Sequence, residues 1–470
     1  MATRLNSPLE TAAEYLESLI DVERMGDRSR ARLDLAPVRE LLSRVGDPQA
    51  GLSVVHVAGS KGKGSTCFLA EGILAEAGER VGTFTSPHLT SWVERFRIDG
   101  RPVEGSELAE VVEILRPHVD EMRSAVGPVP TFFDATTAAA LLLFERASVD
   151  RVLLEVGLGG RLDSTNIVQP DVACISTIEL EHTDILGDRI ESIAFEKAGI
   201  VKPGVPCVVG PLPGPALDVV RERANEVGAP LREFGVDFEI DIQSESSPVA
   251  TGPVPRSFRY RERGGFEVDA RLKVLGDHQA INASLAIAAV RCLGGYSDAT
   301  LERAVREGLP RVELPGRVEI IAREPWVLVD EAHTVASTEA LVKLLPAFEA
   351  SECHLVLSIS RDKKLGPILR SLLPSFDRVI VTRSEKHRSM DPVKLAAEIR
   401  QRGHVDVEVC PDPRRAVQEA RKGVGRRGLL CAAGSIYLAG IAREEFRRPA
   451  PCVWRRLPRN NDCARKRFEI

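Results

Sequence analysis

The sequence predicts an α/β protein in which a parallel-sheet domain is followed by a smaller, doubly wound α/β domain of the Rossmann-like kind. Three observations predict this fold class. A β-branched strand pattern, a glycine-rich turn and a helix pattern follow one another between residues 54 and 78. Residues 307–316 are rich in proline and glycine, as a linker is. After this linker, strand and helix patterns alternate to about residue 446, which is typical of a parallel sheet.

The predicted domain boundary lies in this linker. We expect a first domain over residues 1–311 and a second over residues 312–446. Residues 447–470 are rich in arginine, contain three prolines and have no periodic pattern, so we expect a disordered tail. The alternative is a segment that binds a partner.

Composition excludes some classes of protein. The formal net charge is −5, so the chain carries no basic excess for binding nucleic acid or a membrane surface. No apolar run reaches the ~18 residues that a membrane span needs, and the first residues lack the apolar core of a signal peptide. The cysteines are scattered without a C-x-x-C pair, which indicates reduced thiols. We therefore expect a cytoplasmic protein.

The chain begins with two predicted helices and a charged segment between them. Ser7 to Glu10 form a capping box, and apolar residues continue at helical spacing to Ile20. Residues 21–30 are charged and broken by glycine, which is typical of a solvated loop. The alternative is a clamp in which Arg24 and Arg28 hold an anionic or planar substrate. A second helix is expected from about residue 34 to residue 45.

Residues 54–66 carry the most informative pattern, an apolar strand followed by a glycine-rich turn and the start of a helix. Glycines let backbone N–H groups turn towards an anion, and a helix N-terminus adds partial positive charge. Lys63 supplies a full charge, and Ser65 or Thr66 supplies a hydroxyl for a phosphate-bound Mg²⁺. The glycines of the turn are Gly59, Gly62 and Gly64. The pattern predicts a P-loop, that is, a nucleotide-binding site.

The match to the usual P-loop pattern, G-x-x-x-x-G-K-[ST], is imperfect. With Gly62 and Lys63 as the G-K pair, Val57 stands at the first position and Gly64 at the last. The alternative is a glycine turn with a solvated lysine. The strand before the turn and the helix after it favour the phosphate-binding reading.

Polar residues follow the next predicted strands of the first domain. The strand at 80–84 ends in Thr-Ser-Pro-His, which places Ser86 at the carboxyl end of a strand, although a Ser-Pro turn is the alternative. The strand at 150–155 ends in the carboxylate of Glu155, and a glycine-rich loop follows. Parallel α/β sheets bind ligands at the carboxyl ends of their strands, so an acid placed there can contact a metal ion.

Two further candidates follow the strand at 172–176. His182 lies beyond the end of this strand, and Lys197 lies near the end of the helix that follows. A lysine in that position is usually a surface charge matched to the helix dipole. The remaining patterns of this domain predict a hairpin at 96–103, helices at 107–122, 133–146, about 188–199, 216–227 and 279–293, a strand at 205–209, and antiparallel strands within 235–275.

The second domain alternates strand and helix patterns, with strands at 326–330, 354–358, 378–381, 405–409 and 429–431. A cleft between two α/β domains is a usual place for a site that closes over ATP.

Together these pieces resemble the folylpolyglutamate synthase/dihydrofolate synthase family, which belongs to the Mur-type ATP-dependent amide ligases. The resemblance runs from about residue 8 to residue 446, and its specificity lies in the order and spacing of the pieces. The pieces are His56-Val-Ala-Gly-Ser-Lys-Gly-Lys-Gly-Ser-Thr66, Thr85-Ser-Pro-His-Leu89, Glu155-Val-Gly-Leu-Gly-Gly-Arg-Leu-Asp-Ser-Thr-Asn166, Glu181-His-Thr-Asp-Ile-Leu-Gly187, Glu196-Lys-Ala-Gly-Ile200, Gly276-Asp-His-Gln279 with Asn282-Ala283, and Leu314-Pro-Gly-Arg317.

The resemblance implies a role for individual residues. It implies that Asp330 contacts a ribose, that Lys197 is carbamylated beside the metal ions, and that residues 21–30, with Arg24 and Arg28, form the loop for a pterin substrate. The implied nucleotide-binding set is Gly59, Gly62, Lys63, Gly64, Ser65, Thr66, Asn282, Arg317, Asp330 and His333. The implied ligands of a pair of Mg²⁺ ions are Ser65, Ser86, Glu155 and His182, and the implied catalytic residues are Lys63, His182 and Lys197.

The resemblance also implies an activity. An ATP-dependent ligase of this family adds L-glutamate to a folate-type carboxylate, either dihydropteroate or tetrahydrofolate or both, through an acyl phosphate. ATP and Mg²⁺ are the implied cofactors, and we expect a monomer without nucleic-acid or membrane partners. Two alternatives stay open, a Mur-type ligase for another acid and a non-catalytic nucleotide-binding relative.

The chain departs from the family pattern at several positions. The family usually has Asp-Gly-Ala-His-Asn where this chain has Asp-Glu-Ala-His-Thr at residues 330–334. Lys61 replaces a more common asparagine, Glu181 stands where aspartate is usual, and residues 361–364 match the family loop only in part. These changes affect expected efficiency more than fold, and those at Glu331 and Thr334 favour the non-catalytic alternative. The Asp-Glu-Ala-His run also resembles a helicase box, but a linker separates it from the P-loop, so we exclude a helicase.

Overall fold

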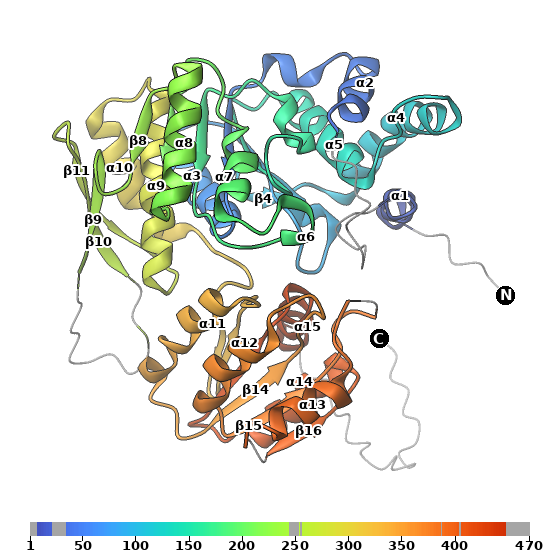
Figure 1. Cartoon of the computed structure of the whole chain (residues 1–470), viewed down its shortest axis with the longest axis vertical. Helices are drawn as coiled ribbons and strands as arrows, with labels where there is room; N and C mark the ends of the chain where they lie inside the picture. Colours follow the sequence, from blue (N-terminus) through green and yellow to red (C-terminus); the bar gives the residue numbers. More distant parts are fainter. Residues whose placement is uncertain are drawn as a thin grey trace, which may run out of the picture.

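The computed structural model describes residues 7–20, 34–243, 253, 256–386, 388–403 and 406–447. Arg24, Arg28 and the segment 448–470 lie outside the described residues, so the predicted substrate loop and tail stay predictions. The chain forms two bodies, an upper one coloured blue to yellow and a lower one coloured orange to red (Figure 1). No helix among the described residues is long and apolar enough to cross a membrane.

The upper body is built on an eight-stranded sheet with strand order β4-β3-β2-β5-β1-β6-β7-β8. The central strand β1 pairs in parallel with β5 and β6. All five residues of β1 are buried, because helices cover both faces of the sheet. The strands are β1 (Val54–Ala58), β2 (Val81–Phe84), β3 (Phe96–Ile98), β4 (Arg101–Pro102), β5 (Arg151–Glu155), β6 (Val172–Ile175), β7 (Cys207–Val209) and β8 (Leu231–Glu233).

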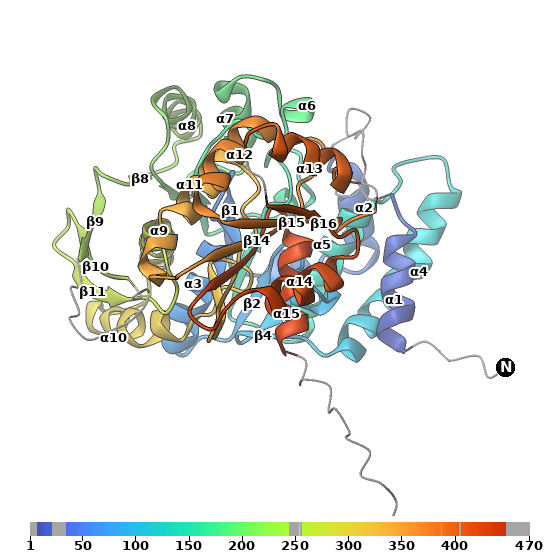
Figure 2. The ribbon, with the colours of Figure 1, turned by 90° about the horizontal axis from the view of Figure 1, so that it is seen from below.

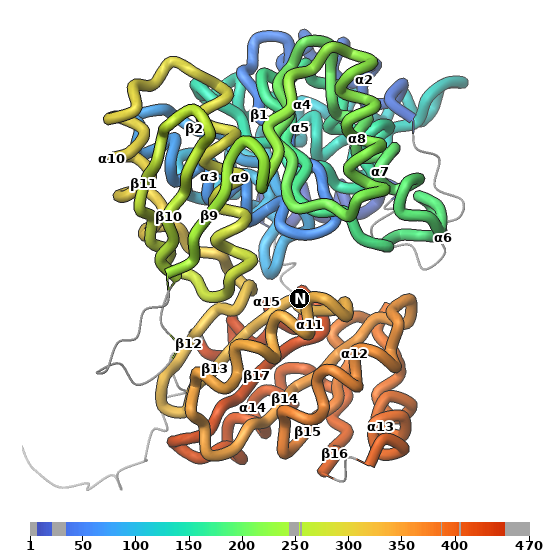
Figure 3. Tube along the Cα trace, turned by 60° about the vertical axis from the view of Figure 1, so that its left-hand side comes forward, coloured from blue at the N-terminus to red at the C-terminus, as the bar shows by residue number. Residues whose placement is uncertain are grey.

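Two layers of helices enclose this sheet. On one face, Val55 and Val57 of β1 share a core with α3, α9 and α10, and on the other face the cores involve α1, α2, α4, α5, α7 and α8 (Figures 2 and 3). The predicted capping box of α1 is confirmed, since Glu10 N–H donates to Ser7 Oγ and Ser7 N–H donates to Glu10 Oε2. The helices are α1 (Pro8–Glu17), α2 (Ala36–Arg44), α3 (Lys63–Glu76), α4 (Gly105–Ser124), α5 (Phe132–Arg146), α6 (Thr183–Leu186), α7 (Ile190–Ala198), α8 (Gly214–Val227), α9 (Asp277–Leu293) and α10 (Asp298–Gly308).

A small antiparallel sheet lies at one side of the upper body, at the left edge of Figure 1. Its strand order is β11-β10-β9, which confirms the antiparallel strands predicted within residues 235–275. Tyr260 of β10 is buried in the same core as α9. The strands are β9 (Phe238–Gln243), β10 (Ser257–Glu262) and β11 (Glu267–Arg271).

The lower body is built on a six-stranded sheet with order β12-β13-β17-β14-β15-β16. Every pair in it is parallel except β12 with β13. One face packs against α11, α12 and α13 and the other against α14 and α15, so the predicted doubly wound sheet is confirmed. The elements are β12 (Glu319–Arg323), β13 (Trp326–Val329), α11 (Val335–Val342), β14 (Cys353–Leu357), α12 (Leu365–Leu372), β15 (Arg378–Val381), α13 (Pro392–Arg400), β16 (Val407–Val409), α14 (Pro413–Gly423), β17 (Leu429–Ala433) and α15 (Ile436–Arg447).

The two bodies touch through α15. A side chain at Gly440 would collide with the backbone of Leu89 in the upper body, and Leu89 packs against the core beside α15. In Figures 1 and 3, α11 and α15 lie at the part of the lower body nearest the upper one.

Among the α-helices and strands of the described residues, four were not predicted. The strand β8 and the helix α6 are short, and β12 pairs antiparallel at the edge of the second sheet. The helix α10 starts at the cap Ser297, whose side chain accepts from Thr300 N–H, and continues through Gly308 into the predicted linker. The prediction that the linker starts at residue 307 is therefore wrong. The boundary at residues 311 and 312 stays a prediction.

The cysteines agree with the prediction of reduced thiols. The seven cysteines among the described residues are free, and most of them are buried. Burial raises the pKa of the Cys174 thiol to about 12, so this thiol is protonated at neutral pH.

Candidate active site

The turn between β1 and α3 has a backbone that only glycine adopts easily. Gly62, which caps the N-terminus of α3, has φ of 84°, in the left-handed region. A Cβ at Gly62 would also collide with the side-chain oxygen of Asn282 on α9. The turn and Asn282 therefore lie against each other, as the predicted nucleotide-binding set requires.

Two lysines converge on the first glycine of this turn. Lys63 Nζ donates to the carbonyl oxygen of Gly59 at 3.0 Å, and Lys197 Nζ donates to the same oxygen at 2.9 Å. Lys197 also forms an ion pair with Glu181 at 3.0 Å, and its side chain is only 2% exposed. The prediction from helix position alone, a surface charge, is therefore wrong, because α7 carries Lys197 inward against the turn.

The buried pair has shifted pKa values. Burial lowers the pKa of Lys197 to about 8, although Glu181 opposes this shift. Burial works against the charge of Glu181, yet Lys197, Lys63 and Lys61 together lower the pKa of its carboxyl to about 2. Glu181 had no predicted role, and its pairing with Lys197 fixes both side chains beside the turn.

Glu155 lies at the first turn of α3. Its Oε2 accepts a hydrogen bond from the backbone N–H of Ser86 at 3.1 Å, which joins the ends of β5 and β2. A Cβ built on Gly64 would lie 3.0 Å from this oxygen and 3.0 Å from Nη2 of Arg317. Burial raises the pKa of Glu155, while Lys63 and Arg317 oppose that shift. The structure thus brings Glu155, Ser86 and Arg317 together around Gly64.

These donors fit a metal ion that arrives with phosphate. Ser65 is buried in the same turn of α3, and the Oγ1 of the buried Thr66 has no hydrogen-bond partner among the described residues. The described residues contain no group of three or more histidine, cysteine, aspartate or glutamate side chains that could hold a metal ion. One carboxylate with hydroxyls, completed by phosphate oxygens, is the usual environment of Mg²⁺.

His182 lies in the segment that follows β6. It caps α6 with φ of 48° and follows Glu181 directly in the sequence. A left-handed histidine is uncommon and marks a sharp change of chain direction. Its grouping with Glu155 as a metal ligand stays a prediction.

Asp330 directly follows β13, and both oxygens of its carboxylate accept hydrogen bonds from the protein backbone. Its two oxygens accept hydrogen bonds at 2.7 Å from the backbone N–H groups of Val318 and Ala332. Burial raises its pKa to about 7. These bonds tie the end of β13 to the segment that follows the linker, and the predicted contact with a ribose stays a prediction.

Two further contacts join the parts of the site and were missed by sequence reasoning. Lys61 Nζ lies 3.4 Å from Nε2 of His333, which links the phosphate-binding turn to the lower body. Arg317 Nε donates to Glu331 Oε1 at 3.0 Å. The available signal was that Lys61 and Glu331 both depart from the family pattern.

The glycine-rich loop after β5 is held by buried carboxylates. Asp163 accepts from the backbone N–H of Leu158 at 2.8 Å and from the hydroxyl of Thr165, which also contacts Nε2 of His56 at 2.9 Å. Burial raises the pKa of Asp163 to about 6. The loop packs against α7, since a Cβ at Gly160 would lie 2.8 Å from the carbonyl oxygen of Glu196. It therefore supports the helix that carries Lys197.

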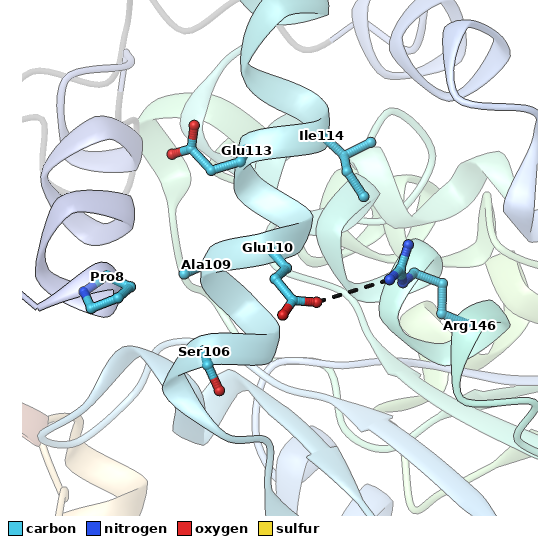
Figure 4. Close-up of a pocket in the computed structure, with 7 residues that line it drawn as sticks. All are labelled: Pro8, Ser106, Ala109, Glu110, Glu113, Ile114 and Arg146. Atoms are coloured by element: carbon cyan, nitrogen blue, oxygen red, sulfur yellow. Dashed lines mark ion pairs between the residues drawn. The ribbon is translucent and has the colours of Figure 1, made fainter.

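A separate surface pocket of about 510 Å³ lies away from these residues (Figure 4). It is formed mainly by α4, and Glu110 and Arg146 form an ion pair across it at 3.9 Å. Its other lining residues are Pro8, Ser106, Ala109, Glu113 and Ile114. None of the predicted site residues lines it.

Two protein-family models match this chain, one in each body. Residues 57–290 match the family model described as the Mur ligase middle domain. Residues 316–436 match the Mur ligase, glutamate ligase domain. The first match contains the phosphate-binding turn, and the second begins at the last residue of the linker, directly before Arg317.

Relatives with similar sequence and structure belong to one family. A dihydrofolate synthase/folylpolyglutamate synthase of Mycobacterium tuberculosis is 32% identical over 470 aligned positions, covering 93% of this chain and 95% of that protein. The crystal structure of Mycobacterium tuberculosis folylpolyglutamate synthase complexed with ADP and AMPPCP has a TM-score of 0.81 and 30% identity, covering 94% of this chain and 99% of that one.

A longer relative matches over part of its length. A probable bifunctional folylpolyglutamate synthase/dihydropteroate synthase of Haloferax volcanii is 35% identical over 411 residues, which are 87% of this chain. The chain spans 48% of the length of that protein. From the matches over nearly full length and the two Mur ligase domains, the chain belongs to the folylpolyglutamate synthase/dihydrofolate synthase family of Mur-type ligases.

Proposed function

We propose that this protein is an ATP-dependent ligase that joins L-glutamate to the carboxylate of a folate-type acid. The acceptor is dihydropteroate, tetrahydrofolate or both. The observation that supports this most directly is the convergence of Lys63 and Lys197 on Gly59, with Glu155 and Arg317 around Gly64. The family relationship and the nucleotide complexes of its members support ATP as the phosphoryl donor.

The chemistry explains why ATP is needed. A carboxylate is a poor acyl donor because its leaving group would be oxide. Transfer of the γ-phosphoryl group from ATP to the carboxylate oxygen gives an acyl phosphate and ADP. The amino group of glutamate then attacks the acyl carbon, the amide forms, inorganic phosphate leaves and the amine loses a proton.

Residues of this chain act mainly by positioning. We assign Lys63 and the backbone N–H groups of the turn to the β- and γ-phosphates, where they neutralise charge on the group in transfer. In this proposal Asn282 holds the nucleotide against the turn, which its position at Gly62 supports. Gly62 and Gly64 allow the phosphates to approach the backbone closely.

We assign Mg²⁺ to Ser65, Ser86 and Glu155, with His182 as a further ligand, and propose two ions. Bound there with ATP, Mg²⁺ supplies Lewis-acid stabilisation of phosphate charge. The single buried carboxylate and the neighbouring hydroxyls fit an ion that keeps phosphate oxygens among its ligands.

We also propose that Lys197 is carbamylated. Its pKa of about 8 leaves part of the population as the neutral amine, which is the form that reacts with CO₂. The product, N-carboxylysine, carries a carboxylate instead of an ammonium group, and the proton is released. In this state the ion pair with Glu181 is absent, and the new carboxylate takes the place of a metal ligand. Mass spectrometry under native conditions in ¹³C-bicarbonate tests this point. A cytoplasmic location and a monomeric state stay predictions.

The decisive experiment measures glutamate-dependent phosphate release from MgATP, once with dihydropteroate and once with tetrahydrofolate. A response to dihydropteroate alone assigns a dihydrofolate synthase, and a response to both assigns a bifunctional enzyme. ATP binding without release on either acceptor contradicts the proposal. It then favours a ligase for another acid or a non-catalytic relative.

A further inference from the structure

Arg317 is bonded to Glu331 and lies beside Gly64 and Phe68. Its Nε donates to Glu331 Oε1 at 3.0 Å, and its Nη2 reaches within 3.0 Å of the Cβ position of Gly64. Its Cζ lies 6.0 Å from the ring centroid of Phe68 on α3. Arg317 directly follows the linker between the bodies, and its guanidinium lies beside the first turn of α3.

Glu331 is itself fixed by its backbone. Its N–H donates to the carbonyl oxygen of Gly316 at 2.9 Å, and its carbonyl oxygen accepts from Nδ1 of His333 at 2.7 Å. Since a carbonyl can only accept, Nδ1 carries the hydrogen, and Nε2 of His333 is left to accept from Lys61. The segment 330–333 is therefore held from the linker and from the phosphate-binding turn.

Two carboxylates from different bodies face the same guanidinium. Glu155 Oε2 lies 3.0 Å from the same Gly64 position as Nη2 of Arg317. Burial opposes the charge of Arg317, yet Glu331 and Glu155 together raise its pKa. After Glu331, Glu155 is the carboxylate whose charge acts most strongly on Arg317, and it is the carboxylate that we assign to Mg²⁺.

We propose that Glu331 is a positioning residue, which holds Arg317 over the first turn of α3 and keeps Glu155 unpaired for Mg²⁺ bound with the nucleotide. This inference rests on the proposed function, because it takes Arg317 as a nucleotide contact. In this proposal the negative charge of Glu331 supports nucleotide binding, whereas its departure from the family pattern alone favours a non-catalytic protein.

A double-mutant cycle tests whether Glu331 acts through Arg317. The variants are Glu331→Ala, Arg317→Met and the double variant, with Glu339→Ala as the matched control. Glu339 is an exposed carboxylate on α11, close to Glu331 in the sequence. The probe is AMPPNP, titrated calorimetrically at several Mg²⁺ concentrations, with thermal unfolding recorded for each variant. No folate is needed for this binding measurement.

Each single variant is expected to weaken MgAMPPNP about tenfold, and the double variant to bind no worse than Arg317→Met alone. Glu331→Ala is also expected to need several times more Mg²⁺ for half-saturation, which a purely structural role would not change. If the affinity losses of the two single variants multiply in the double variant, the proposal is overturned. An unchanged Mg²⁺ requirement in Glu331→Ala overturns it as well.

Glu331→Gln keeps the test decisive if the alanine variant folds poorly. Glutamine retains an oxygen that accepts from Nε of Arg317, so its affinity for MgAMPPNP is expected to stay closer to wild type than that of Glu331→Ala. An affinity no better than that of the alanine variant overturns the proposal. A different result would contradict only the proposed function. In that case the wild type binds MgAMPPNP tightly and the effects of the Glu331 and Arg317 substitutions do not multiply, but no glutamate-dependent phosphate is released.

Discussion

The carboxyl ends of the two parallel sheets are built from different chemistry. In the upper body, Lys63, Lys197 and Glu181 lie together beyond the ends of β1 and β6. Both lysines donate to the carbonyl oxygen of Gly59, and Lys197 forms an ion pair with Glu181. In the lower body, Asp330 follows β13, but the ends of β14 and β15 carry neutral hydroxyls, where Ser358 contacts Ser384 at 2.9 Å and Ser389 at 3.3 Å. Hydroxyls can satisfy each other without the cost of removing a charge from water.

This difference indicates that the charged edge of the upper sheet binds an anion. Buried cations are costly unless an anion compensates them, so a fold keeps them only where an anion binds or a pair forms. Lys197 has such a pair in Glu181, whereas Lys63 is bonded to the neutral carbonyl of Gly59. We infer that the charge of Lys63 is the one available for phosphate. The predictions below test this division, from the largest expected effect to the smallest.

The largest effect is expected from Lys63→Met. Loss of a charge aimed at the transferring phosphoryl group should lower kcat by about 10²–10³-fold, measured as glutamate-dependent phosphate release. The control is Lys394→Met, an exposed lysine on α13. A Lys63 variant that keeps more than a tenth of the activity, with the control unchanged, would contradict the assignment.

Breaking the buried pair of Lys197 and Glu181 should also lower the stability of the fold. Lys197→Met leaves the carboxylate of Glu181 without its closest cation, and removing one partner of a buried pair costs about 3–5 kcal/mol. Urea unfolding at pH 7 in buffer free of CO₂ measures this loss. The double variant Lys197→Met/Glu181→Gln removes both charges and should recover part of it. Equal stability of the single and double variants would show that the two side chains are not coupled.

Acid should weaken the same pair. The pKa of Glu181 is about 2 in the folded protein against an ordinary 4.5, so its charge stabilises the fold above pH 4.5. That contribution is lost as the pH falls from 4.5 towards 2, because the folded state must then take up the proton. The difference in unfolding free energy between wild type and Glu181→Gln should therefore shrink over this range. Glu339→Gln, in an exposed position, should show no such change.

How far the sequence predicts this site depends on how close its parts lie in the chain. The turn, Lys63 and Ser65 lie within a few residues, and Glu155 ends a clear strand, so local pattern is enough to find them. The two sheets and their helices follow from periodicity in the same way.

The rest depends on contacts between distant segments. Lys61 is 272 positions from His333, and Lys197 is 138 positions from Gly59. No spacing rule links such residues, and helix position alone predicts a surface lysine at residue 197. The burial of α7 against the glycine-rich loop decides its environment instead. For the same reason the role of Glu331 is visible only once β13 and the linker are placed together.

A smaller effect is expected from Gly64→Ala, which should lower the affinity for MgAMPPNP without lowering the stability of the fold. Gly64→Ala places a methyl group 3.0 Å from Glu155 Oε2 and from Arg317 Nη2, so it should weaken MgAMPPNP binding. We expect about a tenfold loss, with an unfolding free energy equal to wild type or up to ~1 kcal/mol higher, because alanine favours a helix over glycine. Calorimetry and urea unfolding on the same preparation measure both quantities. A variant that loses stability together with affinity would show that the turn itself has been disrupted.

The smallest effect is expected in the serine cluster of the lower body, Ser358, Ser384 and Ser389. Ser358 is fully buried, and its Oγ accepts from the backbone N–H of Ser384 at 3.2 Å. Ser358→Ala removes that acceptor and should cost about 1 kcal/mol of stability, the usual net value of one hydrogen bond. Affinity for MgAMPPNP should not change, because no charge is lost and the phosphate-binding turn is in the other body. A Ser358 variant that binds MgAMPPNP several times more weakly, at full stability, would place part of the nucleotide site on the second sheet and remove the distinction between the two edges.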